Sequence, residues 1–229
     1  MKQAVFEQLE DYMLQCMRDS AHDKEHVYRV LYLALDIAGQ EPETNTDVLI
    51  AACLLHDIGR QAQYVDPTVC HAEYGARMAE TYLSEQGFDP VFVRHVCECI
   101  RCHRFRKNSP PESLEAKILF DADKLDATGA MGIARTLLYN GKMDEPLYSL
   151  TEHGLLSDGR GDHTPSFFQE YHYKLAKLYD RFYTQRGREL AEQRRSHAEG
   201  FFDNLFRETA AAYDAKHLLP QKYLEIFEI

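Results

Sequence analysis

The chain has 229 residues, of which 45% are hydrophobic and 28% are charged. These fractions are typical of a globular protein and exclude a disordered chain, a collagen and a disulfide scaffold. With 26 Lys and Arg against 37 Asp and Glu, the formal net charge is -11. This charge argues against a protein that binds long nucleic acid by neutralising many phosphates, but it permits a small anionic substrate if a metal supplies local positive charge.

Neither a membrane span nor an export signal is indicated by the sequence. No run of about 18 apolar residues occurs, and the acidic residues in the opening stretch MKQAVFEQLEDYML argue against a secretory signal. We therefore expect a cytoplasmic protein with reduced cysteines and no membrane partner.

One cysteine pattern suggests a different class of protein. The segment Cys99-Ile-Arg-Cys102-His103 matches the CxxCH spacing of covalently attached haem. Because such attachment normally follows export, we favour the interpretation that Cys97, Cys99 and Cys102 lie along one helix as small hydrophobic residues.

Apolar residues recur at helical spacing from one end of the chain to the other. One helix is expected near the N-terminus, a second from about Lys24 to Gly39, and a third that has Asp47 as its N-cap and ends at Gly59. Further helices are expected over about 70–86, 90–103, 166–186 and 188–216, with an apolar run that opens at Glu112 and loops at 107–113 and about 151–165. The predicted fold class is therefore all-α. We expect a single domain over 1–229, with a core to about residue 140 and helices over about 141–229 that wrap it.

Potential metal ligands recur near the ends of these predicted helices. They are His26, His56, Asp57, His71, His103, Asp121 and Asp123. Ligands at helix ends converge more freely than ligands in the middle of helices. Imidazole nitrogen combined with carboxylate oxygen suits Mn²⁺, Fe²⁺, Co²⁺ or Zn²⁺, with open positions for water and phosphate oxygens.

The order of these ligands resembles a known family. His26 lies in DKEHVYRV, His56-Asp57 in LLHDIGR and Asp123 in DADKLDA, and the strings HAEYGARMAE and DADKLDATGAMGIAR extend the likeness over about residues 20–140. The sequence thus resembles the small, single-domain bacterial branch of the HD-domain superfamily of metal-dependent phosphohydrolases. The resemblance implies an HD-domain helical bundle with additional C-terminal helices. It also implies hydrolysis of a phosphate ester or anhydride, usually of a nucleotide, by metal-activated water.

The resemblance also implies roles for individual residues. One divalent metal (Mn, Fe, Co, Ni, Zn or Mg) would be bound by His26, His56, Asp57 and Asp123. His56 and Asp57 would form the catalytic centre. Asp123 is preferred to Asp121 because the ADKL that contains it matches an ADRL-like motif of related enzymes.

Two further histidines fall where dinuclear HD phosphodiesterases bind a second metal. His71 and His103 would either hold that second metal, with Asp57 bridging, or contact the substrate. We expect one tightly held metal, with both histidines near the phosphate.

Positive charge near the motifs supports an anionic substrate. Some HD hydrolases have an acidic helper a few positions after the His-Asp pair, whereas this chain has Ile58-Gly59-Arg60. Arg60 and Lys124 are therefore the preferred phosphate contacts, and Arg104 is a third candidate. Arg29 and Arg101 are interpreted as part of a solvated helix face.

Several alternatives stay open at the level of sequence. The loop over about 151–165 either covers the site or is a surface connection. A non-catalytic metal- and nucleotide-binding regulatory protein is the main alternative to an enzyme, and a product assay separates the two. No residue selects the phosphate bond that is cleaved, the native metal or the oligomeric state.

Overall fold

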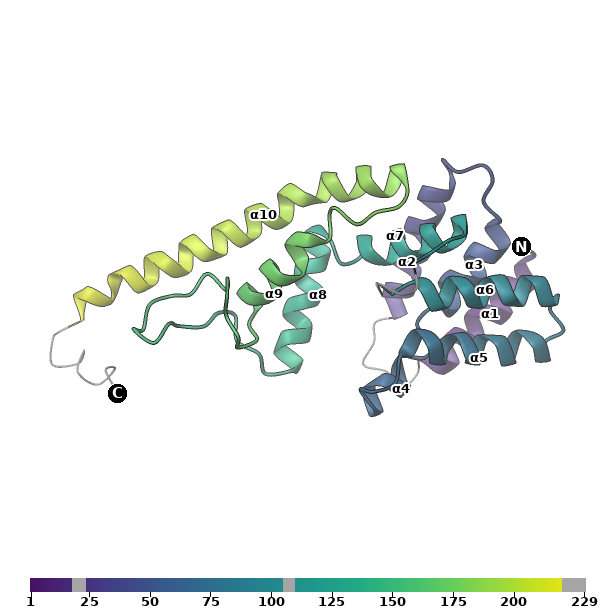
Figure 1. Ribbon diagram of the computed structural model, residues 1–229, viewed down its shortest axis with the longest axis horizontal. Coiled ribbons are helices and arrows are strands. Elements are labelled where there is room, and N and C mark those ends of the chain that lie inside the picture. The colour runs from purple at the N-terminus through teal and green to yellow at the C-terminus, as the bar shows by residue number, and fades with distance from the viewer. Residues whose placement is uncertain (18–23, 105–109, 220–229) are drawn as a thin grey trace. The chain divides into compact units, whose positions relative to one another are not determined.

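The computed structural model describes residues 1–17, 24–104 and 110–219, and they form helices joined by loops (Figure 1). The α-helices are α1 Gln3–Cys16, α2 Lys24–Ala38, α3 Thr46–Leu55, α4 Arg60–Val65, α5 His71–Glu85, α6 Pro90–Cys102, α7 Leu114–Leu125, α8 Gly129–Lys142, α9 Phe167–Tyr173 and α10 Gln185–Asp214, with 3₁₀ helices at Leu175–Lys177 and Ala215–Leu218. Within the described residues, the extended pairing is a single bridge between Leu150 and Leu156. The all-α prediction is confirmed.

The chain divides into two compact units. The first contains Met1–Asp126 and Phe182–Leu190, and the second contains Ala127–Arg181 and Ala191–Ile229. The first unit thus ends at Asp126 and takes in a short C-terminal segment, whereas the sequence pattern put the end of the core near residue 140. The single-domain assignment over 1–229 stays a prediction. Among the described residues, no helix has the length and apolar character needed to span a bilayer.

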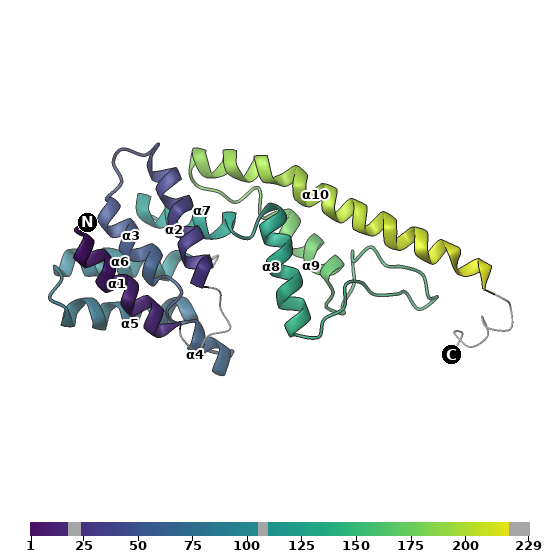
Figure 2. The ribbon, with the colours of Figure 1, turned by 180° about the vertical axis from the view of Figure 1, so that it is seen from behind.

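Helix α3 is the centre of the first unit. Its sequence is almost continuously apolar, and Leu49, Cys53 and Leu54 are fully buried. It contacts α1, α2, α6 and α7, α5 and α6 run side by side (Figure 1), and Figure 2 shows α1 on the other face of the bundle. Because α3 is surrounded on most sides, its C-terminal end delivers His56 and Asp57 into the protein interior.

A close approach of two glycines follows the end of α3. A Cβ atom on Gly59 would lie 2.4 Å from the carbonyl oxygen of His71 and 2.6 Å from the backbone nitrogen of Gly75. Any side chain at Gly59 would therefore push the first turns of α5 away. This contact fixes the start of α5, and with it His71, beside the turn that carries Asp57.

Both ends of α3 differ from the prediction. The helix ends at Leu55 and not at Gly59, which is instead the N-cap of α4. Asn45 is the N-cap of α3, and the Asn45 side chain accepts a hydrogen bond of 3.2 Å from the backbone N–H of Val48. Asp47 lies instead in the first turn, where a negative charge is favoured by the helix dipole, and its carboxylate pairs with the amino group of Met1. Asn and Asp are both favourable N-cap residues, so local preference does not separate them, and it is the Asn45 side chain that forms the capping hydrogen bond.

The C-terminal helices also differ from the prediction. The expected helix over 166–186 ends early, as α9 at Tyr173, and α10 begins at Gln185 and not near residue 188. Thr184 fixes the start of α10, because its hydroxyl accepts a hydrogen bond of 3.0 Å from the backbone N–H of Gly187. In the second unit, Tyr171 stacks on Phe202 with ring centroids 4.0 Å apart. In the loop over about 151–165, the carboxylate of Asp162 accepts hydrogen bonds from the hydroxyl groups of Ser149 and Ser157. Residues 107–109 of the predicted 107–113 loop lie outside the described residues.

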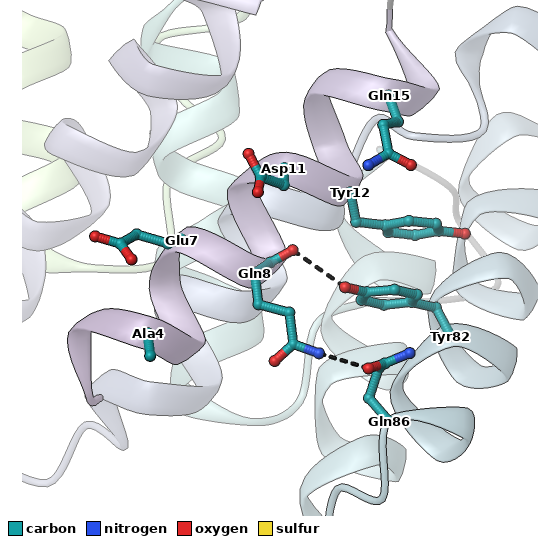
Figure 3. Close-up of a pocket in the computed structure, with 8 residues that line it drawn as sticks. All are labelled: Ala4, Glu7, Gln8, Asp11, Tyr12, Gln15, Tyr82 and Gln86. Atoms are coloured by element: carbon teal, nitrogen blue, oxygen red, sulfur yellow. Dashed lines mark hydrogen bonds between the residues drawn. The ribbon is translucent and has the colours of Figure 1, made fainter.

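A surface groove of about 410 Å³ lies between α1 and α5. Tyr12 and Tyr82 stack in it with ring centroids 3.7 Å apart, and the Tyr82 hydroxyl donates to the carbonyl oxygen of Gln8 (Figure 3). None of the metal-ligand candidates lines this groove. We interpret it as the seam by which α1 closes the bundle.

Candidate metal centre

Six predicted ligands converge inside the first unit. They are His26 in the first turn of α2, His56 at the C-cap of α3, Asp57 in the turn that follows, His71 as the first residue of α5, His103 at the C-cap of α6 and Asp123 in the last turn of α7. The side chain of Asp123 is 12% exposed, and the other five side chains are buried almost completely. Such a concentration of buried polar groups requires partners, because burial without them is costly.

His26, His56 and Asp123 form the first group of donor atoms. The Nε2 atom of His26 lies 3.3 Å from Oδ1 of Asp123 and 3.4 Å from Nε2 of His56. The three donor atoms lie within 4.8 Å of one another, so one ion can contact all of them.

Asp57, His71 and His103 form the second group. Oδ1 of Asp57 lies 3.5 Å from Nε2 of His71 and 3.5 Å from Nε2 of His103. The two Nε2 atoms are 3.2 Å apart. These three donor atoms also lie within 4.8 Å of one another.

The Asp57 carboxylate lies between the two groups. Its Oδ1 atom faces the second group, whereas its Oδ2 atom lies 3.6 Å from Nε2 of His26 and 3.7 Å from Nε2 of His56. One carboxylate thus presents one oxygen to each group, as a residue bridging two ions would.

The outer nitrogen of each histidine contacts an acceptor. The Nδ1 atom of His26 lies 2.7 Å from Oδ2 of Asp126, and that of His56 lies 2.7 Å from the carbonyl oxygen of Cys53. The Nδ1 atom of His71 lies 2.5 Å from Oε1 of Gln63, and that of His103 lies 2.6 Å from the carbonyl oxygen of Ile100. Each ring therefore donates from Nδ1 and turns the lone pair of Nε2 inward. Lone pairs facing each other at 3.2 and 3.4 Å repel unless a positive charge lies between them. The residues present thus fit a divalent cation in each group.

The carboxylates of Asp57 and Asp123 are also in the charge state that metal binding requires. Burial raises the pKa of Asp57, but the positive charge of Arg60 and the neighbouring His56 outweigh burial and hold that pKa well below its usual value. Burial also raises the pKa of Asp123, but the positive charge of Lys124 and the hydrogen bond with His26 outweigh burial and hold that pKa well below its usual value. Both carboxylates are therefore ionised, which is the form that binds a metal.

The histidines are not equivalent. Burial lowers the pKa of His56 to about 4 and that of His71 to about 2, so both are neutral. Burial also lowers the pKa of His26, but hydrogen bonds with Asp123 and Asp126 outweigh it and raise that pKa to about 9. In the metal-free protein a proton on His26 takes the place of a cation, and a metal competes with that proton.

The predicted phosphate contacts lie beside these groups. Arg60 Nε donates to Asp57 Oδ1 at 3.0 Å, and Lys124 Nζ donates to Asp123 Oδ2 at 2.7 Å. Arg104 is part-buried near the start of α5, with Nη1 4.0 Å from the thiol sulfur of Cys70. All three cations belong to the first unit, and their contact with a substrate stays a prediction.

The two carboxylates of DADKLDA point to different partners. Asp123 faces His26, whereas Asp121 accepts hydrogen bonds from the backbone N–H groups of Tyr183 and Thr184 and from the Thr184 hydroxyl. Asp121 therefore anchors the start of α10 to α7 and lies outside both donor groups.

Sequence reasoning missed the residues that support the ligands. Arg29, interpreted as solvated, donates from Nε to Oδ1 of buried Asp126 at 2.7 Å, and that interpretation was wrong. Asp126 and Gln63 have no role in the sequence prediction. The signal for Asp126 was present: it lies one helical turn after Asp123, as Arg29 lies one turn after His26. Arg101, as predicted, is at the surface, near Glu73 and Glu80.

The CxxCH segment does not have the geometry of a haem site. His103 is fully buried with Nε2 directed at Asp57, and Cys99 is fully buried near the Ser113 hydroxyl. A porphyrin needs both thiols and the imidazole on one open face, and this arrangement leaves no such face.

We expect Cys99→Ser and Cys102→Ser to leave the metal content and the turnover of the protein nearly unchanged, because neither thiol belongs to a donor group. Metal analysis and a visible spectrum check this. A Soret band in the wild-type protein that disappears in either variant would overturn our assignment.

Comparison with known proteins agrees with this geometry. Residues 24–128 match the model of the HD domain family. The sequence is 30% identical to YpgQ of Bacillus subtilis over 196 residues, which is 85% of this chain and 87% of YpgQ. The crystal structure of an HD-superfamily hydrolase from Bacillus thuringiensis superimposes with a TM-score of 0.71 and 29% identity, covering 92% of this chain and 100% of that one. A structure of YpgQ in complex with ADP gives a TM-score of 0.68 and 25% identity, covering 89% of this chain and 97% of that one.

Proposed function

Because this chain belongs to the HD superfamily of hydrolases, we propose that it is a metal-dependent phosphohydrolase whose substrate is a phosphate ester or anhydride of a small nucleotide or related compound. The observation that carries the proposal is the pair of donor groups that share Asp57. A purely structural cluster would not need four imidazoles whose Nε2 atoms all point inward.

The ligand assignment follows from the donor atoms. His26, His56 and Asp123 would hold one divalent ion, His71 and His103 a second, and Asp57 would contact both. These ions supply a lowered pKa for water and electrostatic stabilisation of phosphate oxygens. The neutral His56 and His71 and the ionised carboxylates suit these ions, and a metal would displace the proton of His26.

The cationic side chains would orient the substrate. Arg60 is held at Asp57 by its Nε atom, which leaves the terminal nitrogens of its guanidinium as donors for a phosphate oxygen. Lys124 contacts both Asp123 and the carbonyl oxygen of His103, at 2.7 and 3.4 Å. Its ammonium group thus contacts one residue of each donor group, and we infer that it pairs there with a phosphate oxygen. Arg104 would supply further positive charge.

A nucleotide is the substrate class with most support. The related protein YpgQ has been crystallised in complex with ADP. The net charge of -11 disfavours a long nucleic acid, whereas the local cations described above suit a small phosphate compound. Action in the cytoplasm stays a prediction.

The number of ions is open to a direct test. The sequence favoured one tightly held metal, whereas the equal distances from Asp57 Oδ1 to His71 and His103 favour a second. We expect wild-type protein to bind up to two Mn²⁺ per chain, and His71→Ala and His103→Ala each to lose one, because Asp57 alone is a poor site. Metal analysis after dialysis measures this. If the wild type and both variants each bind the same single ion, these histidines contact the substrate instead.

The proposed activity is tested with metal-stripped, full-length protein. Nucleoside mono-, di- and triphosphates and simple phosphomonoesters and phosphodiesters are each incubated with Mn²⁺, Co²⁺, Ni²⁺ or Mg²⁺, and released phosphate, pyrophosphate and nucleoside products are measured. We expect metal-dependent product from at least one nucleotide. Tight nucleotide binding without product would instead support the non-catalytic regulatory protein.

A further inference from the structure

The support of His26 differs from that of the other three histidines. The Nδ1 atoms of His56 and His103 contact backbone carbonyl oxygens and that of His71 contacts an amide oxygen, all of which are neutral acceptors. Nδ1 of His26 contacts a carboxylate oxygen, Oδ2 of Asp126, at 2.7 Å. One of the two donor groups is thus supported by a charged acceptor.

The Asp126 carboxylate is held in place from its other side. Asp126 is 1% exposed, and Arg29 donates from Nε to Oδ1 at 2.7 Å and from Nη2 to Oδ2 at 3.1 Å. His26 and Arg29 are one turn apart on α2, and Asp123 and Asp126 are one turn apart at the end of α7. The ligand candidates His26 and Asp123 therefore form an inner pair. Arg29 and Asp126, one turn further along the same two helices, form an outer pair that supports them.

Helix stability does not explain the position of Asp126. It is the C-cap of α7, where the helix dipole disfavours a negative charge. Its near-complete burial adds a desolvation cost that a pair with one arginine does not reliably recover. The carboxylate is therefore placed at a cost to the fold, and the group that gains from it is His26.

We propose that Asp126, clamped by Arg29, is the positioning residue that makes the group of His26, His56 and Asp123 the tighter of the two metal centres. This inference rests on the proposed function. A carboxylate acceptor fixes the Nδ1–H tautomer of His26, prevents rotation of its ring and strengthens Nε2 as a donor. The second group has neutral supports and is consequently the weaker centre.

The test uses Asp126→Asn, which keeps the shape of the side chain and removes its charge. Glu115→Gln is the matched control: Glu115 is also a buried carboxylate of α7, but it accepts from the backbone N–H of Asn45 at 2.6 Å and lies in neither donor group. Mn²⁺ is titrated into metal-stripped, full-length proteins by calorimetry. We expect Asp126→Asn to weaken the tighter Kd about 10- to 100-fold and to leave the weaker one essentially unchanged. Glu115→Gln should change neither.

A spectroscopic readout separates positioning from general destabilisation. In zinc-loaded protein, Asp126→Asn should move the His26 Nδ1–H proton resonance upfield, because the charge-assisted hydrogen bond is lost. Arg29→Met should produce a smaller change in the same direction, and it serves as the main variant if Asp126→Asn does not fold.

The outcomes distinguish this inference from the proposed function. Wild-type protein that binds no divalent ion would overturn both. Wild-type protein that binds Mn²⁺, with an unchanged tighter Kd in the folded Asp126→Asn or Arg29→Met variant, would overturn the positioning role alone. An equal loss of affinity in Glu115→Gln would also overturn it, because the effect would then come from the stability of α7.

Discussion

Asp57→Asn is expected to remove most of the bound metal and to lower kcat by at least about 10³-fold, which corresponds to about 4 kcal/mol of lost transition-state stabilisation. Asp57 presents one oxygen to each donor group, with Oδ2 3.6 Å from His26 Nε2 and Oδ1 3.5 Å from His71 Nε2. An asparagine amide has no charge, and its NH₂ group would face either one set of Nε2 atoms or Arg60. Both donor groups are thus damaged by one substitution.

Metal analysis and a product assay with the best substrate of the screen measure this effect. The matched control is Asp66→Asn, the same change at an exposed aspartate whose carboxylate bonds Thr68. It should leave the metal content and kcat as in the wild type. An Asp57→Asn protein that is folded and turns over at the wild-type rate would contradict the metal-dependent mechanism.

The two carboxylates of DADKLDA are expected to have opposite effects when each is replaced by alanine. Asp123→Ala should lose the ion held with His26 and His56 and most activity, because it removes a charged donor 3.3 Å from His26 Nε2. Asp121→Ala should keep the metal content but lower the free energy of unfolding by about 3 kcal/mol, because buried donors at Tyr183 and Thr184 lose their acceptor.

Urea unfolding of the metal-stripped variants, with metal analysis of the loaded ones, measures both effects. Asp121→Asn is the milder companion, since its amide oxygen still accepts one of these hydrogen bonds. Metal loss in Asp121→Ala together with full metal content in Asp123→Ala would show that the ligand had been assigned to the wrong carboxylate.

The local pattern of the sequence predicted most of the helices of the first unit. The spacing of apolar residues together with Gly39 and Pro90 indicated where α2 ends and where α6 begins, because helix signals act over one or two turns. Gly59 was a misleading signal for α3, which ends at Leu55. Where helix signals of similar strength lay close together, the sequence did not show at which residue the helix begins or ends. Asn45 and Asp47 both suit an N-cap, and the aromatic pattern over 166–186 did not indicate that the helix ends at Tyr173.

The amino-acid sequence alone indicates which residue types can act as metal donors and near which helix ends they lie. Whether a donor is an imidazole or a carboxylate follows directly from the sequence, as it does for His26, His56, Asp57 and Asp123. The order of these residues also resembles the pattern of the HD superfamily. The packing of the helices shows in addition that Asp57 faces two donor groups, that Asp121 anchors α10, and that Arg29 and Asp126 support His26. The physical reason is that a ligand type is a property of one residue, whereas the direction of a lone pair depends on the acceptor behind it, which here comes from a helix about a hundred residues away in the chain.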